Sequence, residues 1–280
     1  MNDMPNNIQV SVIISIYNRI DYLKLVLAGF ENQSFTNFEI ILADDGSNEN
    51  AVKEIKSLIS KINFPVYHVW QEDNGFRKNR ILNRAIQAAS TDYLIIIDGD
   101  CIPHSAFVKE HFQNRKEKTC LTGRRINMSQ KITDLLDEEK IKSGYLERNI
   151  FKFLLDSILG YSTEVEKGFY FRNKFLRKIF NKKYRGLLGS NFSIHKNDIL
   201  AINGFDERYE APSVGEDSDI QFRLELNNVK IKSLNNIAIQ YHLYHLFQPR
   251  LQKNLDLFEK IKDDGNAFTR YGIIKDMPHH

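Results

Sequence analysis

The first hundred residues of the chain alternate between two patterns of hydrophobic and polar positions. Four short apolar runs, rich in β-branched residues, are typical of buried strands. Between them, apolar residues recur every three or four positions, as on the buried face of an amphipathic helix. Strands and helices that alternate with short links predict parallel βαβ units and an α/β fold. The expected strands are 10–17, 38–43, 64–70 and 93–97, and the expected helices are 19–34, 48–59 and 77–89.

Polar side chains follow three of the predicted strands at their carboxyl ends. In a sheet of parallel strands these ends share one edge, and ligands bind beyond it. We therefore expect the functional site at this edge. The polar residues concerned are Tyr17, Asn18, Asp44, Asp45, Asp98 and Asp100.

The middle of the chain, residues 127–185, has a different pattern. It is helical in character and rich in aromatic residues, and it shows no sheet periodicity. Within it, residues 167–185 hold eight Lys and Arg, no Asp or Glu, and six Phe or Tyr. We therefore expect one compact domain in two halves, 1–126 and 186–280, with residues 127–185 as a helical insertion.

Composition narrows the class of protein. The 42% apolar and 27% charged residues are the ordinary balance of a soluble globular chain. Two cysteines, Cys101 and Cys120, exclude a disulfide scaffold and a Cys-rich zinc site, and they fit a reducing compartment. Residues 1–9 lack the apolar core of a secretory signal, and no run reaches the ~18 apolar residues of a membrane span, so we expect a cytoplasmic protein. A net charge of +3 is too small to indicate nucleic acid, and we expect no such partner.

Asp98 and Asp100 flank Gly99 at the end of an apolar strand. Two carboxylates in this position can bind one hard divalent cation, Mn²⁺ or Mg²⁺, whose open positions phosphate oxygens can fill. The Asp-x-Asp pattern alone is more typical of a loop, but carboxylates at so apolar a strand end are costly without a cation. His242 and His245 can add an imidazole ligand, or they can be structural histidines.

Two further acidic motifs have both a structural and a functional interpretation. Asp45 can accept a hydrogen bond from the base or ribose of a nucleotide, or it can close a turn before a helix. Glu216, Asp217 and Asp219 stand at a predicted helix start, where acids cap the helix and interact with its dipole. Three acids in four positions exceed what capping needs, and a carboxylate beside an acceptor hydroxyl can serve as a general base.

In these motifs the chain resembles family-2 glycosyltransferases of the GT-A fold. The N-terminal motifs are VSVIISIYNR, ADDGS, NGFRKNRILNRAI and YLIIIDGD. The later motifs GSNFSIHKNDILAINGFDERY, GEDSDIQFRLE and HLYH resemble the catalytic half of β-1,4-galactosyltransferases and of bacterial chondroitin-polymerase-type transferases. The likeness covers about residues 9–124 and 186–258. It implies a Rossmann-like mixed sheet flanked by helices, with a helical aromatic and basic insertion.

The resemblance also implies roles on the donor side. Asp100 would be the direct ligand of Mn²⁺ or Mg²⁺, with Asp98 beside it, His242 the first choice for a further ligand and His245 the second. The residues expected to bind the nucleotide of the donor are Ser15, Tyr17, Asn18, Asp45, Arg77, Arg80 and Asp98.

On the acceptor side, the resemblance implies that Asp217 is the catalytic base. Glu216, Asp219 and Asn191 would bind the acceptor, and residues 204–205 would shape its subsite. The implied reaction is an inverting transfer of a sugar from a UDP-sugar to a hydroxyl of a glycan or lipid-linked acceptor, in bacterial surface polysaccharide synthesis. The competing interpretations are a metal-dependent nucleotidyltransferase, which usually carries a Gly-rich phosphate loop that this chain lacks, and a non-catalytic subunit that binds a sugar or nucleotide.

The sequence departs from these relatives in two places. Leu82 stands where many relatives carry Arg, so the choice between Arg77 and Arg80 stays open. Residues 211–214 replace a tryptophan-rich loop, so Tyr209 becomes the candidate for stacking on the acceptor, while Trp70 is expected in the core.

The basic, aromatic stretch 167–185 allows two interpretations. It can be a solvated helix face whose aromatic side chains turn toward the core. It can instead be a surface for anionic lipid, which would place the protein peripherally at the inner face of the membrane.

Overall fold

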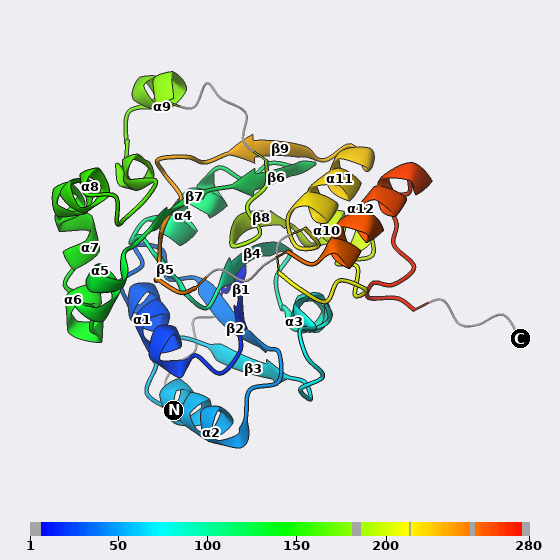
Figure 1. The fold of residues 1–280 in the computed structure, drawn as a ribbon, viewed down its shortest axis with the longest axis horizontal. Coiled ribbons are helices and arrows are strands. Elements are labelled where there is room, and N and C mark those ends of the chain that lie inside the picture. The colour runs from blue at the N-terminus through cyan, green and yellow to red at the C-terminus, as the bar shows by residue number, and fades with distance from the viewer. Residues whose placement is uncertain (1–6, 181–185, 213, 247–249, 276–280) are drawn as a thin grey trace, which may run out of the picture.

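The computed structural model describes residues 7–180, 186–212, 214–246 and 250–275, and a seven-stranded mixed sheet crosses its middle (Figure 1). The first four strands along the chain are parallel, and β8 enters antiparallel to β4. This sheet confirms the predicted α/β fold. Across the sheet, the order is β3 (Val66–Trp70), β2 (Phe38–Asp44), β1 (Val10–Ile16), β4 (Tyr93–Asp98), β8 (Asn191–His195), β6 (Thr119–Thr122) and β9 (Lys230–Ser233).

Alternate side chains of the central strands enter two separate hydrophobic cores. Ile14 of β1 packs into the core shared with α1 (Ile20–Glu31) and α2 (Glu49–Ile59). Its neighbour Ile13 packs into the core shared with α3 (Lys78–Ala88). Two later helices contribute to the same core as α3, namely α10 (Lys196–Ala201) and α11 (Ser218–Leu226).

The link from β2 to α2 forms as the sequence predicts, whereas Trp70, which contacts this link, does not lie where we expected. The Asn48 side chain caps α2 by accepting hydrogen bonds from the backbone N–H groups of Asn50 and Ala51. Trp70 ends the edge strand β3, where its side chain is 43% exposed and its indole N–H donates to the Ser47 carbonyl. The prediction that Trp70 lies in the core was therefore wrong, because an edge strand leaves the ring uncovered.

A second sheet of three short strands brings part of the C-terminal half of the chain next to the end of β4. Its middle strand β10 (Ile239–His242) runs antiparallel to β5 (Cys101–Pro103) and parallel to β7 (Arg124–Asn127). In this register His242 lies opposite Cys101, the residue directly after Asp100. The pairing therefore brings motifs from the two halves of the chain together.

Short helices fill the expected insertion; the last of them, α9, stands at the top of the molecule in Figure 1, and the others lie at the left. Residues 181–185 of the basic stretch lie outside the described residues. Among the described residues, no helix combines the length and the apolar content that a bilayer crossing requires. The remaining helices are α4 (Phe107–Gln113), α5 (Gln130–Asp134), α6 (Glu138–Lys142), α7 (Tyr145–Arg148), α8 (Ile150–Ile158), η1 (Val165–Gly168), α9 (Lys174–Phe180) and α12 (Gln252–Asp264).

Candidate active site

The ends of β1 and β4 meet at the edge where the sequence predicts the site. Ser15 pairs with Asp98 across the two strands, and its hydroxyl donates to Asp98 Oδ1 at 2.9 Å. Gly99 follows, with its N–H donating to the Ser15 carbonyl. A Cβ on Gly99 would lie 2.7 Å from Ile16 Cγ2 and 2.9 Å from the Ser15 carbonyl oxygen. Close packing against β1 therefore requires glycine between the two aspartates.

Lys78, the first residue of α3, joins the two halves of the chain. Its Nζ lies 2.6 Å from Asp98 Oδ1 and 2.5 Å from Glu216 Oε2, and its side chain is almost wholly buried. Burial lowers the pKa of Lys78, but the two carboxylates outweigh burial and raise it above its ordinary value. The acidic motif before α11 and the end of β4 thus lie side by side, joined by a buried cation.

Asp100, His242 and His245 form a compact group beside this bridge. The Nε2 atoms of His242 and His245 lie 3.5 and 3.2 Å from Asp100 Oδ2 and 3.1 Å from each other. The candidate ligand atoms of the three side chains all lie within 4.8 Å of one another. One carboxylate and two imidazoles are a donor set that suits Mn²⁺ and related divalent cations, so these residues fit a metal.

Electrostatic interactions within this group shift the pKa values of Asp100 and His245. Burial raises the pKa of the Asp100 carboxyl, but its interactions with the two imidazoles hold the pKa well below its ordinary value. The interaction with Asp100 raises the pKa of His245. Asp98, also predicted at the metal, does not belong to this group within the described part of the chain, because its carboxylate faces Ser15 and Lys78 instead.

Asp217 stands at the N-terminus of α11, as the sequence predicts. Its carboxylate accepts from the Ser218 N–H at 2.5 Å and from the Ser218 hydroxyl at 3.1 Å. Burial raises the pKa of Asp217 above its ordinary value, and the nearby Lys78 opposes that shift. Burial also raises the pKa of Glu216.

Two residues predicted to bind the acceptor are buried and engaged within the protein. Asn191 is 0% exposed, and its side-chain NH₂ donates to the Arg124 and Ala238 carbonyls while its Oδ1 accepts from the Gly123 N–H. Its amide therefore joins β8 to the three-stranded sheet, and the expectation that it binds the acceptor is corrected.

Asp219 is also 0% exposed, and its Oδ2 accepts from Nε and Nη2 of Arg223 at 2.9 and 2.6 Å. The other guanidinium nitrogen of Arg223 donates to the carbonyls of Ile202 and Gly204. Asp219 therefore belongs to a buried ion pair that secures α11, and it cannot reach an acceptor as we expected.

Arg223→Met should lower the free energy of unfolding by about 3–5 kcal/mol, because it leaves the Asp219 carboxylate buried without its partner. Urea denaturation measures this change. Arg19→Gln is a matched control that breaks an exposed ion pair with Asp21, for which we expect about 0–1 kcal/mol. Equal losses in the two variants would contradict a stabilising role for the buried pair.

The residues predicted to bind the nucleotide line the edge beyond β1 and β2. Asp45 is buried, with its carboxylate accepting from the Gln71 side chain at 2.6 Å and the Arg77 N–H at 2.9 Å. Tyr17 is half-exposed and donates to Asp73, whereas the Asn18 amide oxygen accepts from the backbone and side chain of Asn48. Asn18 thus shapes the turn after β1.

The two candidate arginines differ in their surroundings. Arg77 donates to the Phe76 carbonyl and pairs with Glu210 at 3.3 Å. Arg80 is exposed and lines a hollow of about 300 Å³ together with Arg84. Arg80 therefore has the freer approach to a ligand that enters beside Gln71 and Asp45.

Two cations beside the site, Lys78 and Arg125, were not predicted from the sequence. Lys78 precedes Ile81 and Leu82 by three and four positions, so it shares their inward face, and this spacing could have identified it. Arg125 donates to the Ser190 hydroxyl at 3.0 Å, and its charge interacts with Asp98 and Asp100. No local pattern identifies Arg125, because its position depends on the pairing of β7 with β10.

Comparisons with known proteins agree with this geometry. Residues 11–180 match the family model described as glycosyl transferase family 2, and residues 172–246 match one described as the N-terminal domain of galactosyltransferase. Chondroitin synthase of Escherichia coli is 27% identical over 241 residues, which cover 83% of this chain and 34% of that protein. The chain thus spans about a third of the length of this curated relative.

Two solved structures share the fold. S. aureus TarS 1–349 in complex with UDP-GlcNAc has a TM-score of 0.56 at 16% identity, and the match covers 89% of this chain and 65% of that one. Mannosyltransferase PcManGT from Pyrobaculum calidifontis, in complex with GDP-Man and Mn²⁺, has a TM-score of 0.55 at 12% identity, with coverage of 85% and 58%. These likenesses confirm the predicted GT-A arrangement of the sheet and its flanking helices.

Proposed function

Because the chain belongs to glycosyl transferase family 2, we propose that it transfers a sugar from a UDP-sugar to a hydroxyl of a glycan or lipid-linked acceptor. The observation that carries this proposal is the bridge from Asp98 through Lys78 to Glu216. It places the acids of the C-terminal half beside the strand ends at which nucleotides bind in this type of sheet. The likeness to a chondroitin synthase favours a role in polysaccharide synthesis.

The donor would bind to the first half of the chain, residues 1–126. Asp45 and the strand-end residues Ser15 and Tyr17 would surround the uracil and ribose, with Arg80 near the base or diphosphate. The UDP-GlcNAc complex of TarS supports a UDP-linked donor, because that protein shares the fold.

A divalent cation would be held by Asp100, His242 and His245, with Asp98 close by. When bound, it would stabilise the negative charge that develops on the leaving diphosphate. The Mn²⁺ in the mannosyltransferase complex supports manganese, and the donor atoms of the three residues are compatible with it.

The second half of the chain, residues 186–280, would bind and activate the acceptor. Asp217 would take the proton of the attacking hydroxyl, and Glu216 would accept a hydrogen bond from the same sugar. The hydroxyl would attack the anomeric carbon directly while the bond to UDP breaks. This single displacement inverts the configuration, so an α-linked donor would yield a β-glycoside.

A screen for UDP release tests this proposal. The protein is incubated with Mn²⁺ and, in turn, the UDP derivatives of galactose, N-acetylgalactosamine, glucose and N-acetylglucosamine, with and without oligosaccharide acceptors. We expect one donor to release UDP, faster when an acceptor is present. Release of pyrophosphate instead would indicate nucleotidyl transfer, and binding without release would indicate a non-catalytic subunit.

Lys78→Met should move the acidic limb of the pH–rate profile to higher pH. Lys78 lowers the pKa of the buried Glu216, so its removal should raise that pKa further, and Glu216 would be protonated at a higher pH. An opposite charge at this range changes a carboxyl pKa by about 1–3 units, which is the expected size of the shift. Lys78→Arg keeps the charge and should restore most of the profile. An unchanged acidic limb in Lys78→Met would refute the role of Glu216 as an ionised acceptor ligand.

A further inference from the structure

Two helices of the insertion expose apolar side chains on one side of the molecule. On α8, an outward row consists of Phe151, Leu155, Ile158 and the following Leu159, which are 63–74% exposed. These positions are spaced i, i+4, i+7 and i+8, so they form one continuous stripe along the helix. The opposite face of α8 carries the buried Ile150 and Phe153, which hold the helix on the core.

The second helix, α9, stands away from the body of the protein at the top of Figure 1. It exposes Phe175, Leu176 and Ile179. Arg177 anchors it, because its guanidinium donates to the Phe171 carbonyl and lies 3.4 Å from Glu110. The apolar side chains thus project outward from an element that is tied at its inner face.

Positive charge accompanies the apolar row of α9. In the sequence, residues 167–185 contain eight Lys and Arg and no acid, although Lys167 is paired with Glu164 and Arg177 with Glu110. Close by, Lys109 and Arg172 line a hollow of about 450 Å³. Among the described residues that line it, the one acid is Glu147, which already accepts from the N–H and hydroxyl of Ser105. A partner for this side must therefore offer both apolar groups and negative charge.

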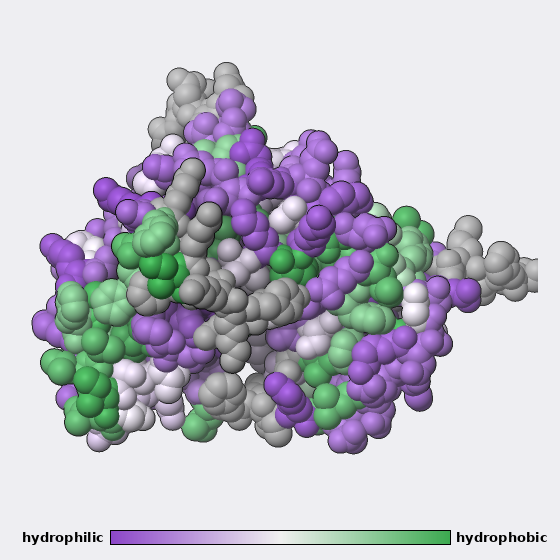
Figure 2. Space-filling view, turned by 90° about the horizontal axis from the view of Figure 1, so that it is seen from above, coloured by the Kyte–Doolittle hydropathy of each residue, from purple (hydrophilic) through white to green (hydrophobic). Residues whose placement is uncertain are grey.

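We propose that the face formed by α8 and α9 docks on an anionic lipid bilayer. Acyl chains would surround the apolar rows, and lipid phosphates would pair with the cations around α9 and at the hollow. In Figure 2 the apolar side chains at the left gather in separate patches with hydrophilic residues between them. Anionic lipid fits this combination, because interfacial binding draws on buried apolar side chains together with the attraction of Lys and Arg to acidic headgroups.

Vesicle co-sedimentation tests the proposal with the unmodified protein. We expect it to pellet with vesicles that contain phosphatidylglycerol and to stay in solution with phosphatidylcholine alone. The bound fraction should fall as salt is added, because exposed charges are screened. Equal pelleting with both vesicle types would overturn the proposal.

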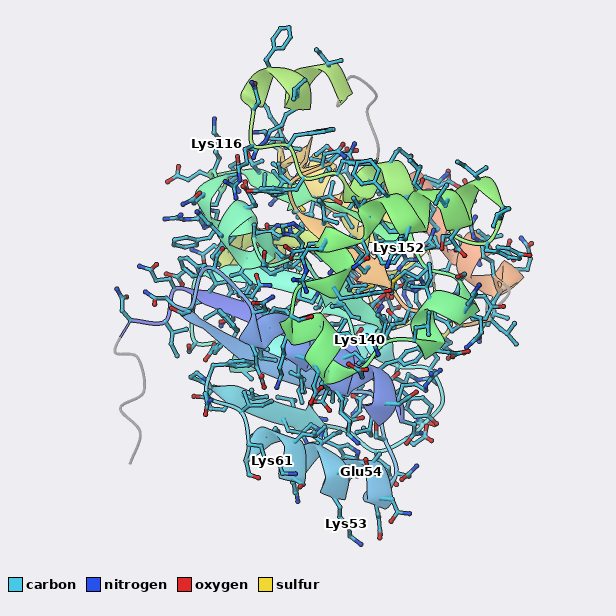
Figure 3. The ribbon with its side chains drawn as sticks, turned by 90° about the vertical axis from the view of Figure 1, so that its left-hand side faces the viewer. Lys53, Glu54, Lys61, Lys116, Lys140 and Lys152 are labelled. Atoms are coloured by element: carbon cyan, nitrogen blue, oxygen red, sulfur yellow. The ribbon has the colours of Figure 1, made fainter. Side chains whose placement is uncertain are left out.

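Two double variants distinguish binding through this face from attraction by the net charge of the protein. Lys109→Gln/Arg172→Gln, at the two cations that line the hollow, should weaken binding roughly 25-fold, about fivefold for each cation. The matched control Lys53→Gln/Lys61→Gln removes two charges at the other end of the view in Figure 3, far from α9, and should change nothing. An equal loss of binding in both double variants would show that only the net charge of the protein matters, and it would contradict a specific docking face.

Phe151→Ser/Leu155→Ser tests the apolar row, and both side chains face solvent, so folding should persist. We expect weaker binding to the anionic vesicles. If gel filtration instead shows a dimer that this variant dissociates, the face is a contact between copies and the proposal fails. UDP release measured without lipid should be unchanged in every variant, so the proposed transfer reaction is tested separately.

Discussion

Asp217→Asn should reduce sugar transfer by about 10²–10⁴-fold while UDP-sugar binding stays nearly unchanged. Asparagine keeps the shape of the side chain, and its amide oxygen can still accept from the Ser218 N–H, so the start of α11 should remain capped. What is lost is a basic oxygen that can take the proton of the acceptor hydroxyl. Initial rates of UDP release with saturating donor, together with calorimetric titration of the donor, measure the two effects.

A second aspartate provides the control for this change. Asp137 caps α6, where it accepts from the Lys140 N–H, and it lies in the helical insertion. Asp137→Asn makes the same chemical substitution at a helix start, and we expect full activity. Transfer at near the unmodified rate in Asp217→Asn would remove Asp217 from the mechanism.

Asp217 contributes, together with Glu216, to the pH dependence of the reaction. Asp217 acts as a base only when it is ionised, and burial raises its pKa above the ordinary value of an aspartate. Activity should therefore fall, as pH decreases, at a higher pH than an exposed aspartate would give.

Asp100→Ala should abolish the manganese dependence of UDP binding. The substitution removes the carboxylate that both imidazoles face, and so it leaves at most two of the three ligands. Even the outer partners of metal ligands typically contribute 10–100-fold to affinity, so we expect a loss of about 100-fold or more. Calorimetric titration of UDP, with Mn²⁺ and again with EDTA, measures it.

The histidines and a distant acid complete this experiment. His242→Ala and His245→Ala should each weaken binding in the presence of Mn²⁺ but not in EDTA. Asp264→Ala removes an exposed carboxylate at the end of α12 and should have no effect. If Asp100→Ala binds UDP with the same manganese dependence as the unmodified protein, the three residues do not hold the metal.

Much of the fold can be read from the sequence because its periodicities are long and unambiguous. The β-branched runs and the helical repeats of the first hundred residues define the parallel strands and the helices between them. The position of Asp98 and Asp100 at the sheet edge follows from these elements alone. The meeting of His242 with Asp100 does not, because β10 is only four residues long and its pairing with β5 is a long-range contact.

The errors within the acidic motif have a local cause. Three acids at a helix start are equally compatible with helix caps, a catalytic base or acceptor ligands. Only the burial of each side chain in the folded protein distinguishes these roles. Asp219 turned inward because Arg223 follows it by four residues, a spacing that predicts an ion pair on one helix face. Asn191 gave no such signal, because its partners are backbone groups of other strands.

The central claim is that Asp100, His242 and His245 hold the diphosphate end of the donor while Asp217 activates the acceptor. The anomeric configuration of the product tests this claim most directly. With an α-linked UDP-sugar that the screen identifies, the purified product is examined by NMR at its new anomeric carbon. We expect a β-glycoside, since the hydroxyl activated by Asp217 attacks from the face opposite the departing UDP. An α-glycoside would contradict direct displacement and the role of Asp217 within it.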